Sequence, residues 1–536
     1  MKRTLMLVLA LTLVLTGTCI AEEFDFLAPM EETVTLTTAR TMTETAVFDV
    51  NDPLKKNYQE NLWTNTFLEK LNIDLDYSWI ATDGDSDATK WAAAIAVGNV
   101  PDFATVDAKT YKMLLDAELV ADCTDTFADY VSDDYKSLLP QDAIDQMVFD
   151  EKLMGLPFPT KGYHGATMLF VRQDWLDSLG LNYPTNYDEL INVARAFKEA
   201  QLGGEETIGM MFSANASDGR LDGFMNMFGA YRNYWVDVDG RVEWSNVQPK
   251  MKDALLALQE LYNEGIINND FAVTTADLAK EYIAGGKTGV FFATSWNTTT
   301  SIEALLGNNP EAKITSHVLF GVDGSDIKFQ TNTPATTKIF VSKNCKNLEA
   351  VAKMLNLTYA LTSNKEDYLI YGVDANNFMW FKYLPYGDQP KSTLNDLINA
   401  HEIRVAYELY EKGEITDGNE YEGWTNADNA NRFNNYVLCK KGESGSFWLA
   451  LTYGTDGAYT KLYDAYQKGL HLSNAYVGLP TETEELMGAV IHDALDTAMF
   501  EVIMGADISV YETACETWLA SGGQDITDEV NAALGK

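Results

Sequence analysis

The chain has 536 residues, too many for one hydrophobic core, so we expect two or three domains. Hydrophobic residues make up 46% and charged residues 22%, a globular composition that excludes a largely disordered chain. Asp and Glu number 79 against 39 Lys and Arg, which gives a formal net charge of −40. A surface this acidic repels nucleic acid and anionic lipid, and argues against a polynucleotide partner.

The N-terminus, MKRTLMLVLALTLVLTGTCIAEEF, predicts a secretory signal peptide over residues 1–21. Lys2 and Arg3 precede a mostly apolar run, 5–15, that is too short to span a bilayer and is followed by small residues. We therefore expect a secreted protein, outside the cytoplasmic membrane of a bacterium.

Two fates are open for this leader. Cleavage after Ala21 would release a soluble chain, whereas lipid on Cys19 would anchor the protein as in bacterial lipoproteins. Thr18 and Thr16 stand where the lipoprotein pattern prefers a small residue and leucine, so the sequence favours simple cleavage.

The first part of the mature chain alternates between strand and helix patterns. Units of this length predict a mainly parallel sheet covered by helices, an α/β fold. The expected strands are 33–40, 73–80 and 101–107, and the expected helices are 61–72 and 89–99.

An extended segment with Pro157 and Pro159 then suits a connection between lobes, because neither proline can lie inside a helix. A strand, a short helix ended by Gly180 and a helix capped near Asn186 follow. Further helices are expected at 250–264, 277–284, 347–360, 393–412, 457–468, 482–504 and 509–520, and a second extended segment at 331–344.

Both lobes are therefore expected to be discontinuous in sequence. The N-terminal lobe comprises 22–159 and 336–378, and the C-terminal lobe 160–335 and 379–536. The chain crosses between them near 157–163, 331–338 and 374–382.

The window AKEYIAGGKTGVFFATSW, residues 279–296, contains Gly-Gly-Lys-Thr, which resembles the end of a phosphate-binding loop. That loop needs a strand before it, a helix after it and another glycine at position 281, which is Glu. Here a helix precedes and an apolar strand, 290–293, follows. We therefore expect an αβ turn in which Gly285 closes the helix.

No catalytic or metal motif stands out. Asp83, Asp85 and Asp87 alternate as in a calcium loop, but Ala88 and Ala94 replace the glycine and glutamate that an EF-hand requires. The five histidines show no zinc-protease spacing, and no Gly-x-Ser-x-Gly elbow occurs. We expect neither a metal nor a cofactor, and read the aspartates as a solvated loop before a helix.

Several tryptophans lie beside polar residues instead of within apolar runs, in Ser295-Trp296-Asn297, Gly423-Trp424-Thr425 and Asn233-Tyr234-Trp235. An aromatic face stacks on the CH groups of a sugar ring while polar neighbours bind its hydroxyls. These edges favour a saccharide ligand, although any single tryptophan more often packs in the core.

Four passages, in order, resemble the extracellular solute-binding proteins of bacterial ABC transporters, of the maltose-binding-protein type and its LipO-like branch. They are GNVPDFATVD, LMGLPFPTKGYHGATMLFVRQDWLDSLGLNYPTNYDELINVARAFK, YIAGGKTGVFFATSW and FEVIMGADISVYETACETWLASGGQDITDEVNAAL. The resemblance implies a two-lobed, class II periplasmic-binding-protein-like fold. It also implies a monomer that closes on a sugar by hinge bending and delivers it to permease subunits.

Carried onto this sequence, the resemblance also suggests ligand-binding residues. Trp296 matches the family's stacking tryptophan, and the other candidates come from the first strand, the end of the strand that follows Asp102, the first crossing and the loop SANASDGRLDGF. They are Arg40, Thr105, Asp107, Tyr163, His164, Asp218, Arg220 and Asp222. Asp102 itself is expected to cap a turn.

The alternative is a secreted carbohydrate-active enzyme such as a glycoside hydrolase, which would share the export signal, the acidity and the polar tryptophan edges. Such an enzyme needs a pair of carboxylates, and with 79 acidic residues the sequence cannot single one out. A surface adhesion module would favour repeats and linkers, which the sequence does not show. A binding protein accounts best for these features together.

Overall fold

The computed structural model describes residues 25–42, 46–159, 162–214, 216–331, 338–372, 378–392, 394–426, 428–443 and 446–536. Within these ranges the side chains of Asp142, His164, Lys365 and Leu369 are not described. The leader, with Cys19 and Ala21, lies outside the described residues, so its cleavage or lipidation stays a prediction. In the described part no helix combines the length and apolar character needed to cross a membrane.

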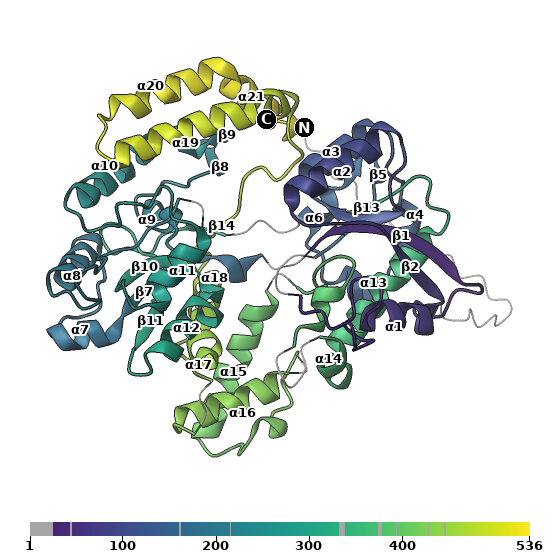
Figure 1. Ribbon diagram of the computed structural model, residues 1–536, viewed down its shortest axis with the longest axis horizontal. Coiled ribbons are helices and arrows are strands. Elements are labelled where there is room, and N and C mark those ends of the chain that lie inside the picture. The colour runs from purple at the N-terminus through teal and green to yellow at the C-terminus, as the bar shows by residue number, and fades with distance from the viewer. Residues whose placement is uncertain are drawn as a thin grey trace, which may run out of the picture.

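The N-terminal lobe, at the right of Figure 1, is built around a five-stranded sheet of order β2-β1-β3-β13-β6. Strands β1 and β2 run parallel along their whole length, and β1 also pairs parallel with β3. The late strand β13 joins antiparallel to β3 and β6. The bounds are β1 Val34–Thr41, β2 Ile73–Ala81, β3 Phe103–Val106, β6 Leu156–Pro157 and β13 Lys338–Val341.

Asp102 connects two strands of this sheet. Its carboxylate accepts hydrogen bonds from the backbone nitrogen and the hydroxyl of Thr37, both at 2.8 Å, and its own backbone nitrogen donates to that hydroxyl. The short strand β3, which pairs with β1 through Thr38 and Phe103, is thereby held beside β1.

Helices cover this sheet, and several of their N-termini carry polar side-chain caps. Asn61 caps α1 by accepting from the backbone of Trp63 and Thr64, and Asp83 caps α2. The helices are α1 Leu62–Leu71, α2 Gly84–Ala96, α3 Ala108–Asp116, α4 Thr124–Tyr130, α5 Asp133–Lys136, α6 Gln141–Asp145, α13 Leu348–Ser363 and α14 Lys365–Tyr371; the small hairpin strands are β4 Val148–Phe149 and β5 Lys152–Leu153.

The C-terminal lobe contains a three-stranded sheet of order β10-β7-β11. Strand β7, Thr167–Arg172, pairs antiparallel with both β10, Val290–Thr294, and β11, Ile314–His317. The expectation of a mainly parallel sheet in each lobe is therefore wrong for this lobe, where parallel pairing is limited to isolated bridges such as Met211 to Phe291 and to one two-residue strand pair. The sequence pattern marks β7 and β10 as buried strands, but burial does not fix their direction.

Helices surround this second sheet and extend beyond it at both ends (Figure 1). The helices are α7 Gln173–Leu179, α8 Tyr187–Glu199, α9 Leu221–Met227, α10 Pro249–Asn263, α11 Ala276–Ala284, α12 Ser301–Asn308, α15 Asn395–Glu411, α16 Asn429–Lys440, α17 Phe447–Tyr453, α18 Ala458–Gln467, α19 Ala489–Ile503, α20 Ser509–Trp518 and α21 Gln524–Ala533. Two short pairs complete the lobe, β8 Trp235–Val238 with β9 Arg241–Trp244, and β12 Phe329–Gln330 with β14 His471–Leu472.

The glycine-rich turn within residues 279–296 joins α11 to β10, as the sequence predicts. Gly285 occupies the C-cap of the helix with φ −78°, and the left-handed conformation belongs to Gly286, with φ 67°. The chain reverses there and enters a strand whose five residues are all buried. No strand–loop–helix order arises, so this turn is not a phosphate-binding loop.

Two separate cores locate the crossings. The core changes between Phe158 and Ala166, and again between Phe329 and Ile339, intervals that contain two of the expected crossings. The third lies later than expected, because Phe381, Tyr383, Leu384 and Tyr386 pack in the N-terminal core and Leu397 is the next residue in the other core. The start of the C-terminal segment at 379 is therefore too early.

A segment that leaves β14 reaches the opposite lobe, and we name residues 473–485 the strap. Asn474, near its start, accepts a hydrogen bond from the backbone nitrogen of Trp235 in the C-terminal lobe. Leu479 packs against a core cluster of the N-terminal lobe, and Glu485 forms an ion pair of 3.0 Å with Lys112 of α3. The strap therefore joins the two lobes without being one of the expected crossings.

Candidate functional site

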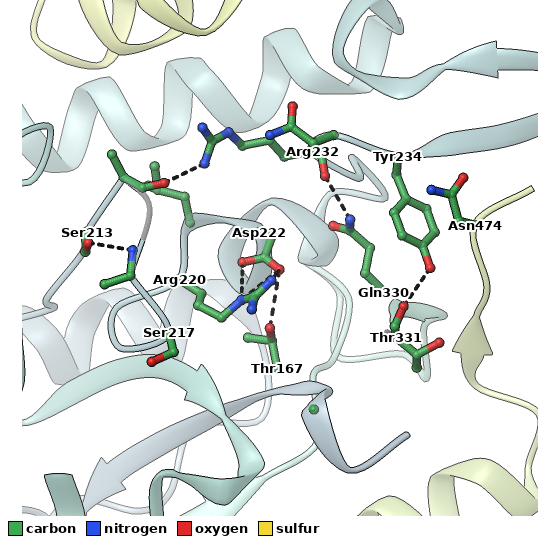
Figure 2. Close-up of a pocket in the computed structure, with 15 residues that line it drawn as sticks. Thr167, Ser213, Ser217, Arg220, Asp222, Arg232, Tyr234, Gln330, Thr331 and Asn474 are labelled. Atoms are coloured by element: carbon green, nitrogen blue, oxygen red, sulfur yellow. Dashed lines mark hydrogen bonds and ion pairs between the residues drawn. The ribbon is translucent and has the colours of Figure 1, made fainter. Parts of the chain in front are cut away.

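A polar cavity of about 550 Å³ opens on the C-terminal lobe near the crossings (Figure 2). This volume suits a small ligand of one to a few rings. Five stretches that are far apart in the sequence line the cavity. The lining residues are Gly165, Thr167, Ser213, Ala214, Ala216, Ser217, Arg220, Leu221, Asp222, Arg232, Asn233, Tyr234, Gln330, Thr331 and Asn474.

Arg220 and Asp222 form an ion pair on the wall of this cavity (Figure 2). Nε of Arg220 donates to Oδ1 of Asp222 at 2.9 Å, and Nη2 donates to Oδ2 at 2.6 Å. The hydroxyl of Thr167 also donates to Oδ2, at 3.3 Å. The side chain of Arg220 is 32% exposed and that of Asp222 12%, so the arginine is the partner that faces the cavity more openly.

Two glycines allow the backbone to bring this pair to the sheet. Gly219, with φ 74°, turns the chain so that the backbone nitrogen of Arg220 can donate to the carbonyl of Phe292 in β10. Gly223, in the first turn of α9, packs directly on the sheet, since a Cβ there would come within 2.6 Å of Phe292 and Thr167. A larger residue would push α9, and Asp222 with it, away from Thr167.

The opposite charges of Arg220 and Asp222 stabilise each other. Burial disfavours the charge on Asp222, but the charge and hydrogen bonds of Arg220 outweigh it and hold the pKa of Asp222 below its ordinary value. The same carboxylate raises the pKa of Arg220. Both groups are charged near neutral pH, and a ligand meets a donor and an acceptor side by side.

Arg232 lies on another wall of the cavity and is also paired. Its Nη1 donates to the carbonyl of Ala214 and its Nη2 to Oδ2 of Asp496 in α19, both at 2.6 Å. Its side chain is only 9% exposed, and its guanidinium lies 5.1 Å from the ring centroid of Phe500. Arg232 therefore anchors the 213–217 loop to α19.

Uncharged polar side chains complete the rim. Tyr234 places its hydroxyl 2.8 Å from the carbonyls of Thr331 and Leu472. Gln330 donates to the carbonyl of Arg232 at 2.9 Å and accepts from Asn226 at 2.8 Å. These bonds fix the segment next to the second crossing, and the cavity is bounded by hydrogen-bonding groups on most sides.

Of the residues predicted for the site, the structure places Arg220 and Asp222 on this wall. Trp296 is half-buried in the turn after β10 and is not among the lining residues, but its neighbour Ser295 donates to the carbonyl of Ala166, next to Gly165 of the lining. Tyr163 packs against Tyr466 and His471, with ring centroids 4.9 and 5.2 Å apart. The side chain of His164 is outside the description.

Asp218 lies beneath the site instead of within it. It is 3% exposed and accepts a hydrogen bond of 2.5 Å from Ser301 in the first turn of α12. Burial raises the pKa of Asp218, against the opposing effects of Ser301, Lys280 and Asn297. Its contacts tie the 213–222 loop to α12.

The candidates of the N-terminal lobe have local partners. Arg40 is 7% exposed, donates to the carbonyls of Leu384 at 2.5 Å and Lys382 at 3.3 Å, and lies 3.9 Å over the ring of Tyr58. Asp107 caps α3 by accepting from the backbone of Thr110 at 2.7 Å. Thr105 sits within the sheet opposite Ile339. None of these candidates lines the cavity, and their ligand roles stay predictions.

Sequence reasoning missed most of the lining. The segment Asn233-Tyr234-Trp235 carried a usable signal, because a polar residue beside aromatic ones marks a saccharide edge. It is Asn233 and Tyr234 that line the cavity, while Trp235 is buried against Trp244. For the remaining residues no local pattern distinguishes a cavity wall from an ordinary polar loop.

The aspartates at 83, 85 and 87 begin a helix, as expected of a solvated loop that leads into one. Asp83 caps α2, and Asp85 and Asp87 lie in its first turn. Within the described residues, no group of three or more His, Cys, Asp or Glu is placed to hold a metal ion.

Two lobes joined by several crossings, with a polar cavity beside those crossings, define a solute-binding protein of the two-lobed class. The sequence matches the bacterial extracellular solute-binding protein family over residues 51–362, and the chain belongs to that family.

The sequence is also similar to three curated bacterial proteins. The polygalacturonan/rhamnogalacturonan-binding protein YtcQ of Bacillus subtilis is 28% identical over 42% of this chain and 45% of its own length. The fructooligosaccharide ABC transporter substrate-binding protein FusA of Streptococcus pneumoniae is 27% identical over 65% of each chain. Lipoprotein LipO of Bacillus subtilis is 32% identical over 24% of this chain and 26% of its own. The chain thus spans about half to two thirds of the length of the first two.

Solved structures agree on the fold over nearly the whole chain. An HMO-binding, ABC-transporter-associated solute-binding protein from Bifidobacterium longum infantis superposes with a TM-score of 0.63 at 15% identity, covering 94% of this chain and 98% of that one. FusA in complex with kestose gives 0.60 at 16% identity, covering 94% and 100%. The two-lobed fold expected from the sequence is confirmed.

Proposed function

We propose that this protein is the substrate-binding component of an ABC importer and captures a sugar or oligosaccharide. The observation that carries the proposal is the Arg220–Asp222 pair on the wall of a polar cavity near the crossings, in a chain of the solute-binding family. Adjacent donor and acceptor groups match the adjacent hydroxyls of a sugar ring. The names of YtcQ and FusA, both carbohydrate-binding proteins, support the same ligand class.

Delivery to membrane permease subunits and a location outside the cytoplasmic membrane belong to the same proposal, as does a monomeric state. Ligand that bridges the two lobes stabilises their closed arrangement, so bound and closed populations rise together. The proposal assigns no catalytic step to the site. A glycoside hydrolase would instead use two carboxylates across the bond to be cleaved, whereas Asp222 is engaged by Arg220.

Trp296 remains part of the proposal as a stacking residue. It directly follows Ser295, whose backbone is bonded to Ala166 beside the cavity. A modest rotation of the lobes or of this turn around a bound ligand would change its exposure. The other predicted ligand contacts, from Tyr163, His164, Thr105, Asp107, Asp218 and Arg40, are held as weaker members of the same set.

A thermal-shift screen across oligosaccharides tests the proposal, because a ligand that binds only the folded state raises its melting temperature. We expect at least one saccharide to stabilise the protein and to make it more compact in solution scattering, with no product formed on prolonged incubation. Release of a shorter sugar would show that the protein is an enzyme. A Trp296→Ala variant that binds within about twofold of wild type would remove the stacking role.

A further inference from the structure

We propose that the ligand is a neutral saccharide and that the cavity discriminates against uronic acids. This inference rests on the proposed function and narrows its substrate class. It starts from the charged residues that line the cavity, which are Arg220, Asp222 and Arg232.

Both cations are already neutralised by protein carboxylates. Arg220 holds Asp222 through two hydrogen bonds and Arg232 holds Asp496 through one of 2.6 Å. Each arginine thus has one carboxylate partner, and the lining with its immediate partners carries no net charge. An acidic ligand would add a negative charge that no cation of the lining is left to balance.

The position that remains open on Arg220 is shared with the carboxylate of Asp222. Nε and Nη2 of Arg220 are used by Asp222, and only Nη1 has no partner among the described residues. A ligand carboxylate that accepts there, even from both Nη1 and the second N–H of Nη2, shares its cation with Asp222 instead of neutralising it. It would also lie on the same guanidinium as Asp222, with two like charges close together. A hydroxyl needs only one donor and adds no charge.

The other groups that remain open on the rim are neutral. The amide nitrogens of Asn233 and Asn474 and the hydroxyl of Ser217 donate to no group among the described residues. The amide oxygens of Asn233 and Asn474 accept from Asn246 and from Trp235. Together with Nη1 of Arg220, these atoms are separate hydrogen-bond donors distributed around the cavity. Such a distribution suits ring and hydroxyl oxygens spread over a sugar.

The field of the whole molecule acts in the same direction. The formal net charge of −40 opposes the approach of an anion, mainly through its rate of association at low salt. The chain therefore differs in expected preference from its relative YtcQ, which is named for a polyuronide.

The test uses matched pairs that differ only at C6, titrated by calorimetry into the full-length mature protein. Suitable pairs are trisaccharides of galactose and galacturonate, glucose and glucuronate, and mannose and mannuronate, each with the same linkage. We expect the neutral member of a binding pair to bind at least about tenfold more tightly. A pair in which the uronate binds equally well or better would overturn the inference and leave carbohydrate binding intact. If no saccharide binds at all, the proposed function fails and the inference fails with it.

Two variants probe the cause. Asp222→Asn keeps the shape of the side chain and leaves Arg220 without its counter-charge, and Asp496→Asn does the same for Arg232 behind the wall. Each should shift the ratio of uronate to neutral affinity toward the uronate by about tenfold or more, a change of about 1.4 kcal/mol. The second variant serves if the first does not fold. Folded variants that leave the ratio unchanged would show that pairing of the arginines does not set the preference.

Discussion

In the N-terminal lobe, Arg40 and Asp107 bond to backbone groups of their own lobe, whereas in the C-terminal lobe Arg220 and Asp222 bond to each other on a cavity wall. The residue types are the same, and both arginines are bonded at 2.5–2.6 Å. The two regions differ in the donors that remain available to a ligand. Backbone groups of the same lobe engage Arg40 and Asp107, whereas Nη1 of Arg220 has no partner among the described residues. A charged side chain near a cleft is therefore a ligand contact only when its partners leave a bonding position free.

The largest effect expected from this comparison is at Arg220. Arg220→Ala removes the open donor and leaves the buried carboxylate of Asp222 without its cation, so ligand affinity should fall by about 2–4 kcal/mol. That is a loss of roughly 30- to 700-fold, measured by calorimetry with a saccharide found in the screen.

Arg195→Ala is the matched control. Arg195 also forms a two-bond pair, with Glu264, but both side chains lie on the surface of the same lobe and are about one-third exposed. This variant should bind ligand as wild type does. Equal losses in the two variants would mean that the cavity is not the binding site.

The two lobes should also differ in how much acid lowers their stability. Burial, followed by the charge of Lys461, lowers the pKa of His317 to about 3, and the imidazole is stacked on Tyr183. The unfolded chain binds the proton near pH 6.5 and the folded chain does not, so the stability that the neutral histidine contributes is present above pH 6.5 and is lost as pH falls toward 3. Residues 25–159 and 338–372 contain no histidine.

We expect His317 to account for about 1 kcal/mol of stability lost between pH 6.5 and 5.5. Urea unfolding at the two pH values measures it, with His317→Phe as the variant that keeps a ring against Tyr183 but cannot titrate. Burial also lowers the pKa values of His401 and His471, so a smaller dependence should remain in the variant. A variant that loses as much stability as wild type would assign the effect to other groups.

For Arg40→Met we expect a loss of stability without a loss of ligand affinity, in contrast to Arg220→Ala. The variant loses the hydrogen bonds to the carbonyls of Thr41, Lys382 and Leu384, with little loss of apolar volume. Bonds to a charged donor contribute about 1.5–3 kcal/mol each, and solvent entry offsets part of this, so we expect about 2 kcal/mol of lost stability in urea unfolding. Ligand affinity should be unchanged, and a stable variant that no longer binds would restore Arg40 to the ligand set.

The smallest effect is expected at Asp107. Asp107→Ala removes the side-chain cap of α3 and should cost about 1 kcal/mol of stability, with affinity within twofold of wild type. Asp107→Asn keeps an accepting oxygen and should recover most of the loss. A large change in affinity with little change in stability would mean that the carboxylate contacts the ligand.

Local chemistry explains how much the sequence could predict. Asn61, Asp83 and Asn186 cap helices because their own neighbours in sequence supply the donors, and Gly180 ends α7 in the left-handed region as expected. Arg220 and Asp222 were predicted only through the family resemblance of their loop, and their mutual pairing is an observation of the structure.

The remaining lining was not accessible from sequence, because it depends on contacts between distant segments. Gln330 is fixed by Asn226, and Arg232 by Asp496, over separations of 104 and 264 residues. The antiparallel direction of β7 and β10 is likewise a tertiary property, and so is the late third crossing, where Phe381 to Tyr386 return to the first core. Hydrophobic periodicity records burial but not the partner.

The strap has a consequence for how affinity responds to mutation. Any motion that parts the lobes at this edge must separate Lys112 from Glu485 and pull Leu479 off the N-terminal core. The fraction of molecules in the joined arrangement multiplies the affinity of the cavity, because the observed dissociation constant equals the intrinsic one divided by that fraction. Residues of the strap that never touch the ligand thus set an upper limit on how tightly the protein holds it.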